Sequence, residues 1–341
     1  MTQITVSILQ DQYTAQPPAV DETLSPPQLR RACAAYKEAS IAPQLGLARQ
    51  AVQQGAGLIV FREDCNGAGN PTLHRLDRPD LLAAMAEPIP GGPTSECLAQ
   101  IARDGSCYVL GCFLETLGER FYNTAVLFSP SGKIAGKYHK THLPPVEQFL
   151  LTPGDDLPVF DTEIGRVGIL ICYDMMTPEV MRCLALKGAD LVCWPSLGYG
   201  WWDEAGDFTI RSRAHDNHVY LLGALPTHSC IVDPYGDVLA SAGMETLTLI
   251  QAEINPGTDP LQDPLHTNTF VTQTPSLRER HLFERRPELY GTLVTPEPDL
   301  MQRYPQTHMR DMAIDKHKVF QHYRSGWGKL HWQTRKDRLT H

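Results

Sequence analysis

The sequence predicts an α/β protein whose sheets mix parallel and antiparallel strands. Short apolar segments alternate with helical ones along most of the first 255 residues, which is typical of α/β domains. Several neighbouring strand segments are separated only by turn residues, as at Ser131-Gly132, and this spacing predicts hairpins. With 42% hydrophobic and 20% charged residues in 341, the chain is able to bury a full core.

The N-terminal half predicts a strand-helix-strand order that is then repeated. Residues 32–54 have a helical composition, broken or kinked near Pro43, and Gly55 ends the helix. A second helix is expected at 97–106. Strands are expected at 4–10, at 57–61, at 107–115 and, as a hairpin, within 122–142.

The next segments continue the alternation. Helices are expected at 177–189, where Thr177 is the N-cap and Pro178 the first helical residue, and at 209–218. Strands are expected at 158–165, 166–174, 190–196, 219–225, 229–241 (a pair) and 246–254.

After Asn255 the character of the chain changes. Residues 257–305 are rich in proline and lack periodicity, and a basic tail follows. We therefore expect a domain at 1–255 and a C-terminal extension at 256–341 that packs on the domain or on a neighbouring subunit.

Charge separates the tail from the rest of the chain. Residues 306–341 carry eight Lys/Arg and three Asp/Glu, a balance of +5 in a chain of −9, which leaves −14 elsewhere. The tail aromatics Phe320, Tyr323, Trp327 and Trp332 favour docking on an acidic protein surface over nucleic acid binding. The sequence has no apolar run of about eighteen residues and no signal-peptide pattern, so a cytoplasmic protein without membrane contact is expected.

The cysteines and histidines do not form a metal-binding pattern. Nine cysteines are scattered without CxxC pairs, a pattern that suggests neither a zinc ribbon nor a disulfide framework and leaves room for a nucleophile. His139 and His142, like His215 and His218, have metal-ligand spacing but no evident third ligand. No metal is expected.

Reactive side chains follow three apolar segments, where a rigid sheet holds a side chain and a loop gives access. They are Glu63 after "GLIVFR", Lys140 in "GKYHKTH" and Cys172 in "GILICYD". A thiol with a pKa of about 8.5 needs a base or cations to act as a nucleophile. Glu63 would accept its proton, and Lys140 with the backbone N–H of Tyr173 would stabilise the oxyanion formed on attack at a carbonyl carbon.

These motifs, over about residues 4–254, resemble the carbon-nitrogen hydrolase (nitrilase) superfamily, in its amidase and carbamoylase-like branch. Members carry a Glu after an apolar strand, a Lys in Y-x-K-x-H-L and a Cys in G-x-x-I-C-Y-D-x-x-x-P-E; here these are Glu63, Lys140 and Cys172. The resemblance implies a four-layer αββα sandwich with two mixed sheets, subunits paired through outer helices as a homodimer or larger homo-oligomer, and a second glutamate, Glu147 in "LPPVEQFL".

The same resemblance implies a chemistry that requires no cofactor. Cys172 attacks a small amide or carbamoyl substrate, Glu63 moves the protons, and a thioester is formed and hydrolysed. An amidase releasing ammonia or an amine is the main expectation. A hydrolase of N-carbamoyl amino acids or β-ureido acids is the alternative. A nitrilase, an acyl transferase and a catalytically silent binding protein stay open.

Three departures from the family pattern bear on the substrate. Arg62 precedes Glu63 where relatives commonly have proline, which would place a cation near the base. Met176, after Met175, occupies a position where many relatives have an arginine, and this favours an acyl group without a carboxylate unless Arg211 or Arg213 supplies the cation. Cys-Tyr-Asp in place of Cys-Trp-Glu favours amides over nitriles. The expected pocket residues are Met175, Met176, Trp194, Tyr199, Trp201 and Trp202.

Overall fold

The computed structural model describes residues 3–12, 15, 24–73, 75, 77–198, 204–257 and 276–295. The chain divides into two units, Met1–Thr258 and Asp259–His341. The basic tail, 306–341, and the predicted pocket residues Tyr199, Trp201 and Trp202 lie outside the described residues.

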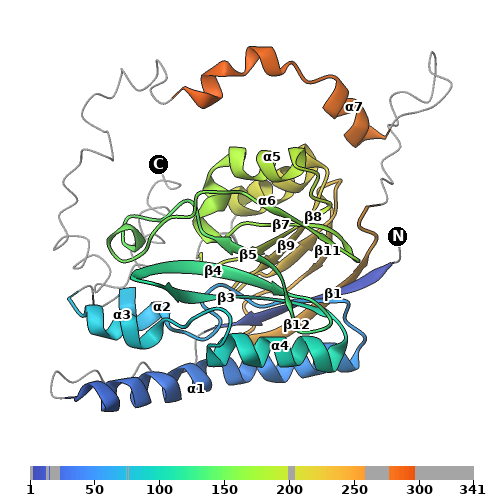
Figure 1. The fold of residues 1–341 in the computed structure, drawn as a ribbon. Helices are drawn as coiled ribbons and strands as arrows, with labels where there is room; N and C mark the ends of the chain where they lie inside the picture. Colours follow the sequence, from blue (N-terminus) through green and yellow to red (C-terminus); the bar gives the residue numbers. More distant parts are fainter. Residues whose placement is uncertain are drawn as a thin grey trace, which may run out of the picture. The chain divides into compact units, whose positions relative to one another are not determined.

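Twelve strands of the first unit form two six-stranded sheets, as shown in Figure 1. The first sheet has the order β12-β1-β2-β3-β4-β5 and the second the order β11-β10-β9-β8-β7-β6. The first contains β1 (Ile4–Asp11), β2 (Leu58–Val60), β3 (Tyr108–Leu117), β4 (Arg120–Phe128), β5 (Ile134–His139) and β12 (Leu247–Ile254). The second contains β6 (Val159–Thr162), β7 (Gly165–Ile169), β8 (Leu191–Pro195), β9 (Tyr220–Ala224), β10 (Cys230–Val232) and β11 (Val238–Ser241).

Both sheets are mixed, as the sequence predicts. In the first sheet β1, β2 and β3 are parallel, and β4, β5 and β12 are added antiparallel. In the second, β7, β8 and β9 are parallel, with antiparallel β6, β10 and β11. Each parallel set directs the carboxyl ends of its strands to one edge, which is where sites form in open α/β sheets.

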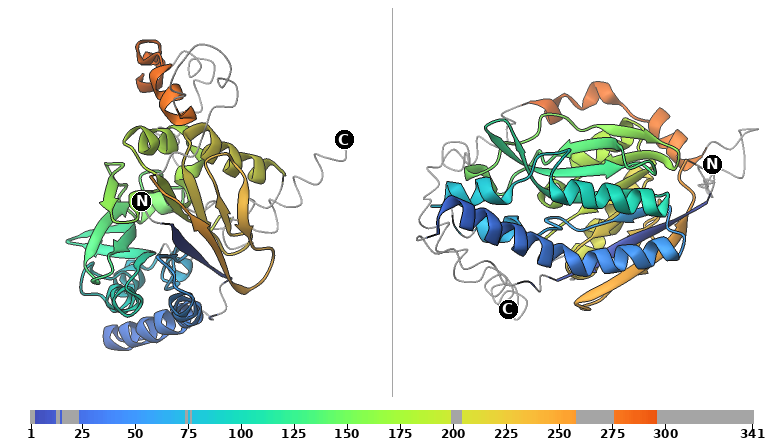
Figure 2. Two further views of the ribbon diagram at one scale, coloured as in Figure 1. Left: turned by 90° about the vertical axis from the view of Figure 1, so that its right-hand side faces the viewer. Right: turned by 60° about the horizontal axis from the view of Figure 1, so that its bottom comes forward.

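Helices cover the outer face of each sheet, and Figure 2 shows the resulting layers from two further sides. Helices α1 (Pro26–Gln53) and α4 (Pro93–Gly105) pack on the first sheet, and α5 (Pro178–Leu186) and α6 (Glu204–Asn217) pack on the second. The expected four-layer αββα sandwich is therefore confirmed. The short helices α2 (Gly69–Leu73) and α3 (Pro79–Met85), which the sequence analysis did not anticipate, follow β2.

Successive side chains along a strand point to opposite faces of its sheet and therefore fill two different apolar layers. On β3, Leu110 and Cys112 enter the core between the two sheets, whereas Val109 and Phe113 pack under α1 and α4. This is the two-residue period of a strand that is buried on both faces. Because each layer is filled by side chains from both sides, the strand ends are held rigidly.

Two expected elements differ from the structure. Helix α1 runs through Pro43 without ending there and begins at Pro26, since both of its halves pack their apolar residues into buried clusters, which outweighs the helix-breaking cost of about 3 kcal/mol. The expected strand 166–174 ends at Ile169, and a 3-10 helix, η2 (Cys172–Met176), begins at the cysteine.

The second unit contains the helix α7 (Leu277–Phe283) and the 3-10 turns η3 (Pro287–Leu289) and η4 (Gly291–Val294). Ser276 caps α7 by accepting a hydrogen bond from the backbone N–H of Glu279. Among the described residues, no helix is both long and apolar enough to cross a membrane.

Gly154 permits the close approach of a loop to the end of β5. Its N–H donates to the Lys140 carbonyl at 2.9 Å, and a Cβ at this position would lie 2.2 Å from the His139 carbonyl oxygen. We expect Gly154→Ala to destabilise the protein by about 2 kcal/mol in urea denaturation, because backbone must move.

The matched control is Gly46→Ala in α1, where an added Cβ meets nothing within 4 Å. It should stabilise the protein by about 0.5–1 kcal/mol. Equal effects of the two substitutions would show that the loop at Gly154 relaxes freely.

Candidate active site

Strand ends from both sheets meet at one place. Glu63 follows β2 by three residues, Lys140 follows β5 directly, and Cys172 follows β7. Leu197, just past β8, donates its backbone N–H to Glu63 Oε2 at 2.7 Å, which joins the second sheet to the first. The three residues expected from the sequence are thus brought together.

Lys140 is the centre of a buried ionic triad. Its Nζ lies 3.0 Å from Glu63 Oε1 and 2.9 Å from Glu147 Oε1. Burial alone would lower the pKa of Lys140, but the Glu147 and Glu63 carboxylates outweigh it and raise that pKa well above its usual range. Lys140 therefore stays an ammonium at any physiological pH.

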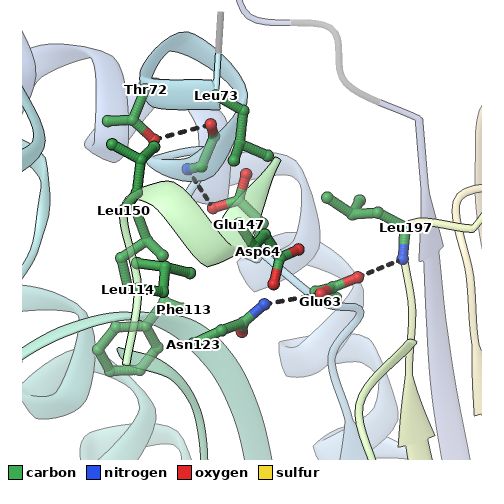
Figure 3. Close-up of a pocket in the computed structure, with 12 residues that line it drawn as sticks. Glu63, Asp64, Thr72, Leu73, Phe113, Leu114, Asn123, Glu147, Leu150 and Leu197 are labelled. Carbon is green, nitrogen blue, oxygen red and sulfur yellow. Dashed lines mark hydrogen bonds between the residues drawn. The ribbon is translucent and has the colours of Figure 1, made fainter. Parts of the chain in front are cut away.

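Glu63 is fixed from three sides. Besides Lys140 and the Leu197 N–H, Asn123 of β4 donates from Nδ2 to Glu63 Oε1 at 2.8 Å. Figure 3 shows the hydrogen bonds of Glu63 with Asn123 and Leu197. The Cys112 thiol donates to Asn123 Oδ1 at 3.3 Å, which sets the orientation of the amide. The sequence analysis assigned no role to Asn123; its position as a buried polar residue in the apolar strand "YNTAVLF" is the signal that would have found it.

Glu147 occupies a 3-10 turn, η1 (Glu147–Phe149), and its side chain is buried. Burial raises the pKa of Glu147 to about 7, with Lys140 opposing that rise and Glu63 adding to it. This carboxyl is therefore able to exchange a proton near neutral pH.

Cys172 has a left-handed backbone with φ of +45°, uncommon for a residue with a Cβ. Trp194 of β8 supports this conformation, since its indole Nε1–H donates to the Cys172 carbonyl at 3.3 Å. Burial and the Glu63 carboxylate raise the pKa of the Cys172 thiol to about 12, against Lys140 and a hydrogen bond with Ser196. The thiol is therefore neutral at rest and needs a base in order to react.

Asp174 connects the cysteine turn to the lysine loop. Its fully buried carboxylate accepts hydrogen bonds from the backbone N–H groups of Ile171 and His142, at 2.8 and 2.9 Å, and from the Tyr138 hydroxyl at 2.8 Å. Thr141 Oγ1 and His142 Nδ1 lie 3.0 Å from Oδ1. Burial would raise the pKa of Asp174, but the bonds from His142, Ile171 and Tyr138 lower it.

The Arg62 guanidinium contacts the backbone that carries Glu63. Its Nη1 donates to the backbone carbonyls of Glu63 and Asp64, each at 2.8 Å, and its Nη2 pairs with Asp11 at 3.1 Å. This buried arginine therefore braces the backbone on which Glu63 is held.

Three of the expected pocket residues lie in the described part of the chain, and they differ in how deeply they are buried. Met175 and Trp194 are buried in the core beneath α5 and α6, and neither is among the residues that line the pocket beside Glu63. Met176 is 58% exposed. Arg211 pairs with Asp207 and Asp237 on the surface.

A pocket lies beside Glu63 and Glu147, as Figure 3 shows. The residues that line it are Glu63, Asp64, Gly69, Thr72, Leu73, Phe113, Leu114, Asn123, Glu147, Leu150, Leu151 and Leu197. Most come from the loop after β2, from β3 and from the turn that carries Glu147. In the described part of the chain, no group of three His, Cys, Asp or Glu residues is arranged to hold a metal ion.

Comparison with known proteins agrees with this geometry. The carbon-nitrogen hydrolase family model matches residues 26–259. An omega-amidase of Xenopus laevis is 34% identical over 235 residues, which cover 61% of this chain and 80% of the relative. A nitrilase of Pyrococcus abyssi is 38% identical over 151 residues, 44% of this chain and 55% of the relative.

A solved structure shares the fold. The amidase from Nesterenkonia has a TM-score of 0.61 at 22% identity and covers 85% of this chain and 96% of its own. The chain therefore belongs to the carbon-nitrogen hydrolase family. It is an enzyme of the class that hydrolyses carbon-nitrogen bonds other than peptide bonds.

The hydrogen bonds to Asp174 lead to a prediction about stability. Because the pKa of this carboxyl is lowered in the folded state, its contribution is present above the unfolded value of about 3.9 and is lost as the pH falls through the folded pKa. We expect Asp174→Asn to lower the free energy of unfolding by about 2–4 kcal/mol at pH 7 and by less at pH 3.

The exposed pair of Asp161 with Arg166 provides the control, and Asp161→Asn should have little effect at either pH. If Asp174→Asn lowers the free energy of unfolding equally at pH 7 and pH 3, the effect comes from altered packing or hydrogen-bond geometry and not from the lost charge.

The charge of Glu63 leads to a second prediction. After burial, this carboxylate is the largest cause of the raised pKa of Cys172. In Glu63→Gln, we expect the Cys172 thiolate to appear about one pH unit lower or more, measured as absorbance at about 240 nm against Cys172→Ser. The exposed Glu96→Gln should not move this titration, and an unchanged titration in Glu63→Gln would place the charge of Glu63 too far from the thiol.

Proposed function

We propose that the protein is an amidase that hydrolyses a linear primary amide through a thioester on Cys172. The observation that supports this most directly is the contact of one buried ammonium, Lys140 Nζ, with both Glu63 and Glu147. A buried cation so placed provides a preorganised charge at a reacting carbonyl, and this kind of electrostatic stabilisation is often the largest contribution to catalysis.

In the first half of the proposed reaction, Glu63 accepts the thiol proton as Cys172 Sγ attacks the amide carbon. This order follows from the pKa of about 12 of the thiol, which leaves few thiolates at neutral pH. Lys140 and the Tyr173 backbone N–H stabilise the oxyanion. Glu63 then gives the proton to the departing nitrogen, and ammonia leaves.

In the second half, water attacks the thioester. Glu63 accepts a proton from the water, the carbon-sulfur bond breaks, and the proton returns to the Cys172 sulfur. Asn123 and the Leu197 N–H hold Glu63 in one orientation through both halves, and Glu147 holds Lys140. The scheme uses only groups of the protein and water.

The preference for an amide over a nitrile is supported by Tyr173-Asp174 after the cysteine and by the similarity to a protein named omega-amidase over most of its length. The 38% identity to a protein named nitrilase covers only 55% of that relative. We therefore place the amide first and treat the nitrile as an outcome of the test.

The test is ammonia release from a panel of primary amides, N-carbamoyl amino acids, β-ureido acids and nitriles. We expect amides to react and Cys172→Ala to reduce kcat/KM by at least about a thousandfold, as loss of a nucleophile usually does. The exposed cysteine provides the control, since Cys183→Ala should keep full activity.

Intact mass after a brief substrate pulse provides an independent measurement. An acyl adduct should appear on the wild type and on Cys183→Ala and be absent from Cys172→Ala. Ammonia release from nitriles alone would refute the amidase assignment, and an adduct that survives Cys172→Ala would remove Cys172 from its role.

A further inference from the structure

The histidines at 139 and 142, which have metal-ligand spacing in the sequence, contact two different carboxylates. His139 Nε2 lies 2.8 Å from Glu115 Oε2, and His142 Nδ1 lies 3.0 Å from Asp174 Oδ1. Both carboxylates are fully buried. An ionised carboxylate only accepts hydrogen bonds, so each of these ring nitrogens carries a proton and donates it. Lys140 lies between the two histidines in the sequence.

Glu115 joins the three strands at the edge of the first sheet. It lies on β3, its Oε2 also accepts the Thr124 hydroxyl of β4 at 2.8 Å, and its Oε1 lies 2.6 Å from Lys137 Nζ of β5. Burial would raise the pKa of Glu115, but the hydrogen bonds from His139, Lys137 and Thr124 lower it. Glu115 is therefore an ionised carboxylate that holds two residues of β5.

Strand β5 has a hydrogen-bonded neighbour on one side only among the described strands, because it ends the order of the first sheet. Strand β4 pairs with it as far as His139, which lies opposite Thr124. The Lys140 N–H then donates to the Asn123 carbonyl, and the Lys140 carbonyl accepts the Gly154 N–H, each at 2.9 Å. An edge strand lacks the second row of backbone hydrogen bonds that fixes an inner strand. Side-chain contacts at the end of β5 therefore help to place Lys140.

The His139 ring is itself fixed in place. The Tyr122 ring of β4 stacks on it, with the ring centroids 4.0 Å apart and the planes inclined by 15°. Tyr122 is buried, and the His139 side chain is 21% exposed. A ring that is stacked on one face and hydrogen-bonded at its edge has little freedom to rotate, so the Glu115 contact also restrains the backbone of His139.

The other end of this segment is fastened to the second sheet. Asp174, in the turn η2 that follows β7, accepts the backbone N–H of His142 at 2.9 Å as well as the contact from its ring. The two carboxylates thus belong to different sheets, with Glu115 on β3 and Asp174 after β7. The backbone of Lys140 is therefore held through one histidine before it and one histidine two residues after it.

We infer that His139 and Glu115 are positioning residues for Lys140, and that the segment from His139 to His142 is a clamp with one end on each sheet. The inference rests on the proposed function, in which Lys140 stabilises the oxyanion. The bound amide does not yet carry that charge, which develops in the transition state. A displaced Lys140 should therefore slow the reaction and leave substrate binding unchanged.

His139→Leu removes the donor and keeps a side chain of similar volume. We expect kcat for the amide that the wild type hydrolyses best to fall about ten- to hundredfold, with KM unchanged within about twofold. His139→Gln, whose amide N–H is able to reach the position of Nε2, should restore most of the lost kcat. A folded His139→Leu with unchanged kcat, or a loss that appears in KM alone, would overturn the inference.

Glu115→Met tests the partner of His139. Methionine has the length of glutamate and lacks its carboxylate, and Lys137, whose side chain is 28% exposed, is then able to reach solvent. We expect a loss of kcat similar to that in His139→Leu. The double variant should lose no more than about threefold beyond the larger single loss, because both changes break the same hydrogen bond. Losses that multiply would remove Glu115 from this role.

The reactivity of Cys172 provides a measurement that does not depend on hydrolysis. Lys140 is one of the groups that oppose the raised pKa of this thiol, so a displaced ammonium leaves less thiolate to react. The probe is iodoacetamide, and mass mapping gives the rate at Cys172 relative to the exposed Cys183. At one fixed pH, this ratio should fall about threefold or more in His139→Leu.

This measurement separates the inference from the proposed function. If the wild type hydrolyses no amide of the panel, the proposed function fails, and the alkylation ratio then decides the inference, which an unchanged ratio would overturn. If amides are hydrolysed through Cys172 and His139→Leu keeps the wild-type kcat, the amidase stands and the clamp is refuted.

Discussion

The buried ammonium of Lys140 between two carboxylates is the interaction on which the rest of the site depends. Three ionisable groups removed from water would each be costly alone, and their cost is offset only where hydrogen bonds satisfy them and the geometry is fixed. Asn123, the Leu197 N–H and the rigid strand ends provide this geometry. The two carboxylates keep Lys140 charged, and burial together with the Glu63 carboxylate keeps the Cys172 thiol protonated.

Two charged residues outside the triad, Asp174 and Arg62, hold the backbone around Cys172, Lys140 and Glu63 in place. Asp174 joins the turn that carries Cys172 to the loop after Lys140, so Cys172 and Lys140 are positioned by one buried carboxylate. Arg62 does the same for Glu63 by holding the carbonyls of Glu63 and Asp64. Asp174 and Arg62 each form hydrogen bonds with backbone groups, which move less freely than side chains. Each of the two lies within two residues of a proposed catalytic residue. The site is therefore set by its surroundings as much as by its own residues.

The pocket beside the triad shares two residues with it. Glu63 and Glu147, which contact Lys140, also line the pocket together with apolar side chains. The buried charges that keep Lys140 an ammonium therefore also act on this space, where the surrounding apolar groups screen them less than water would.

The sequence by itself determined the mixed α/β class, most strand positions and, through three motifs that follow apolar segments, the set of Glu63, Lys140 and Cys172, to which the family resemblance added Glu147. These are local signals, since apolar periodicity and motif spacing are written along the chain. Only the tertiary structure decided the rest. Arg62 pairs with Asp11 and holds the backbone of Glu63, Met175 and Trp194 belong to the core, α1 continues through Pro43, and Asn123 bonds Glu63. The physical reason is that these outcomes depend on residues tens to hundreds of positions apart, whose contacts arise only when the two sheets pack.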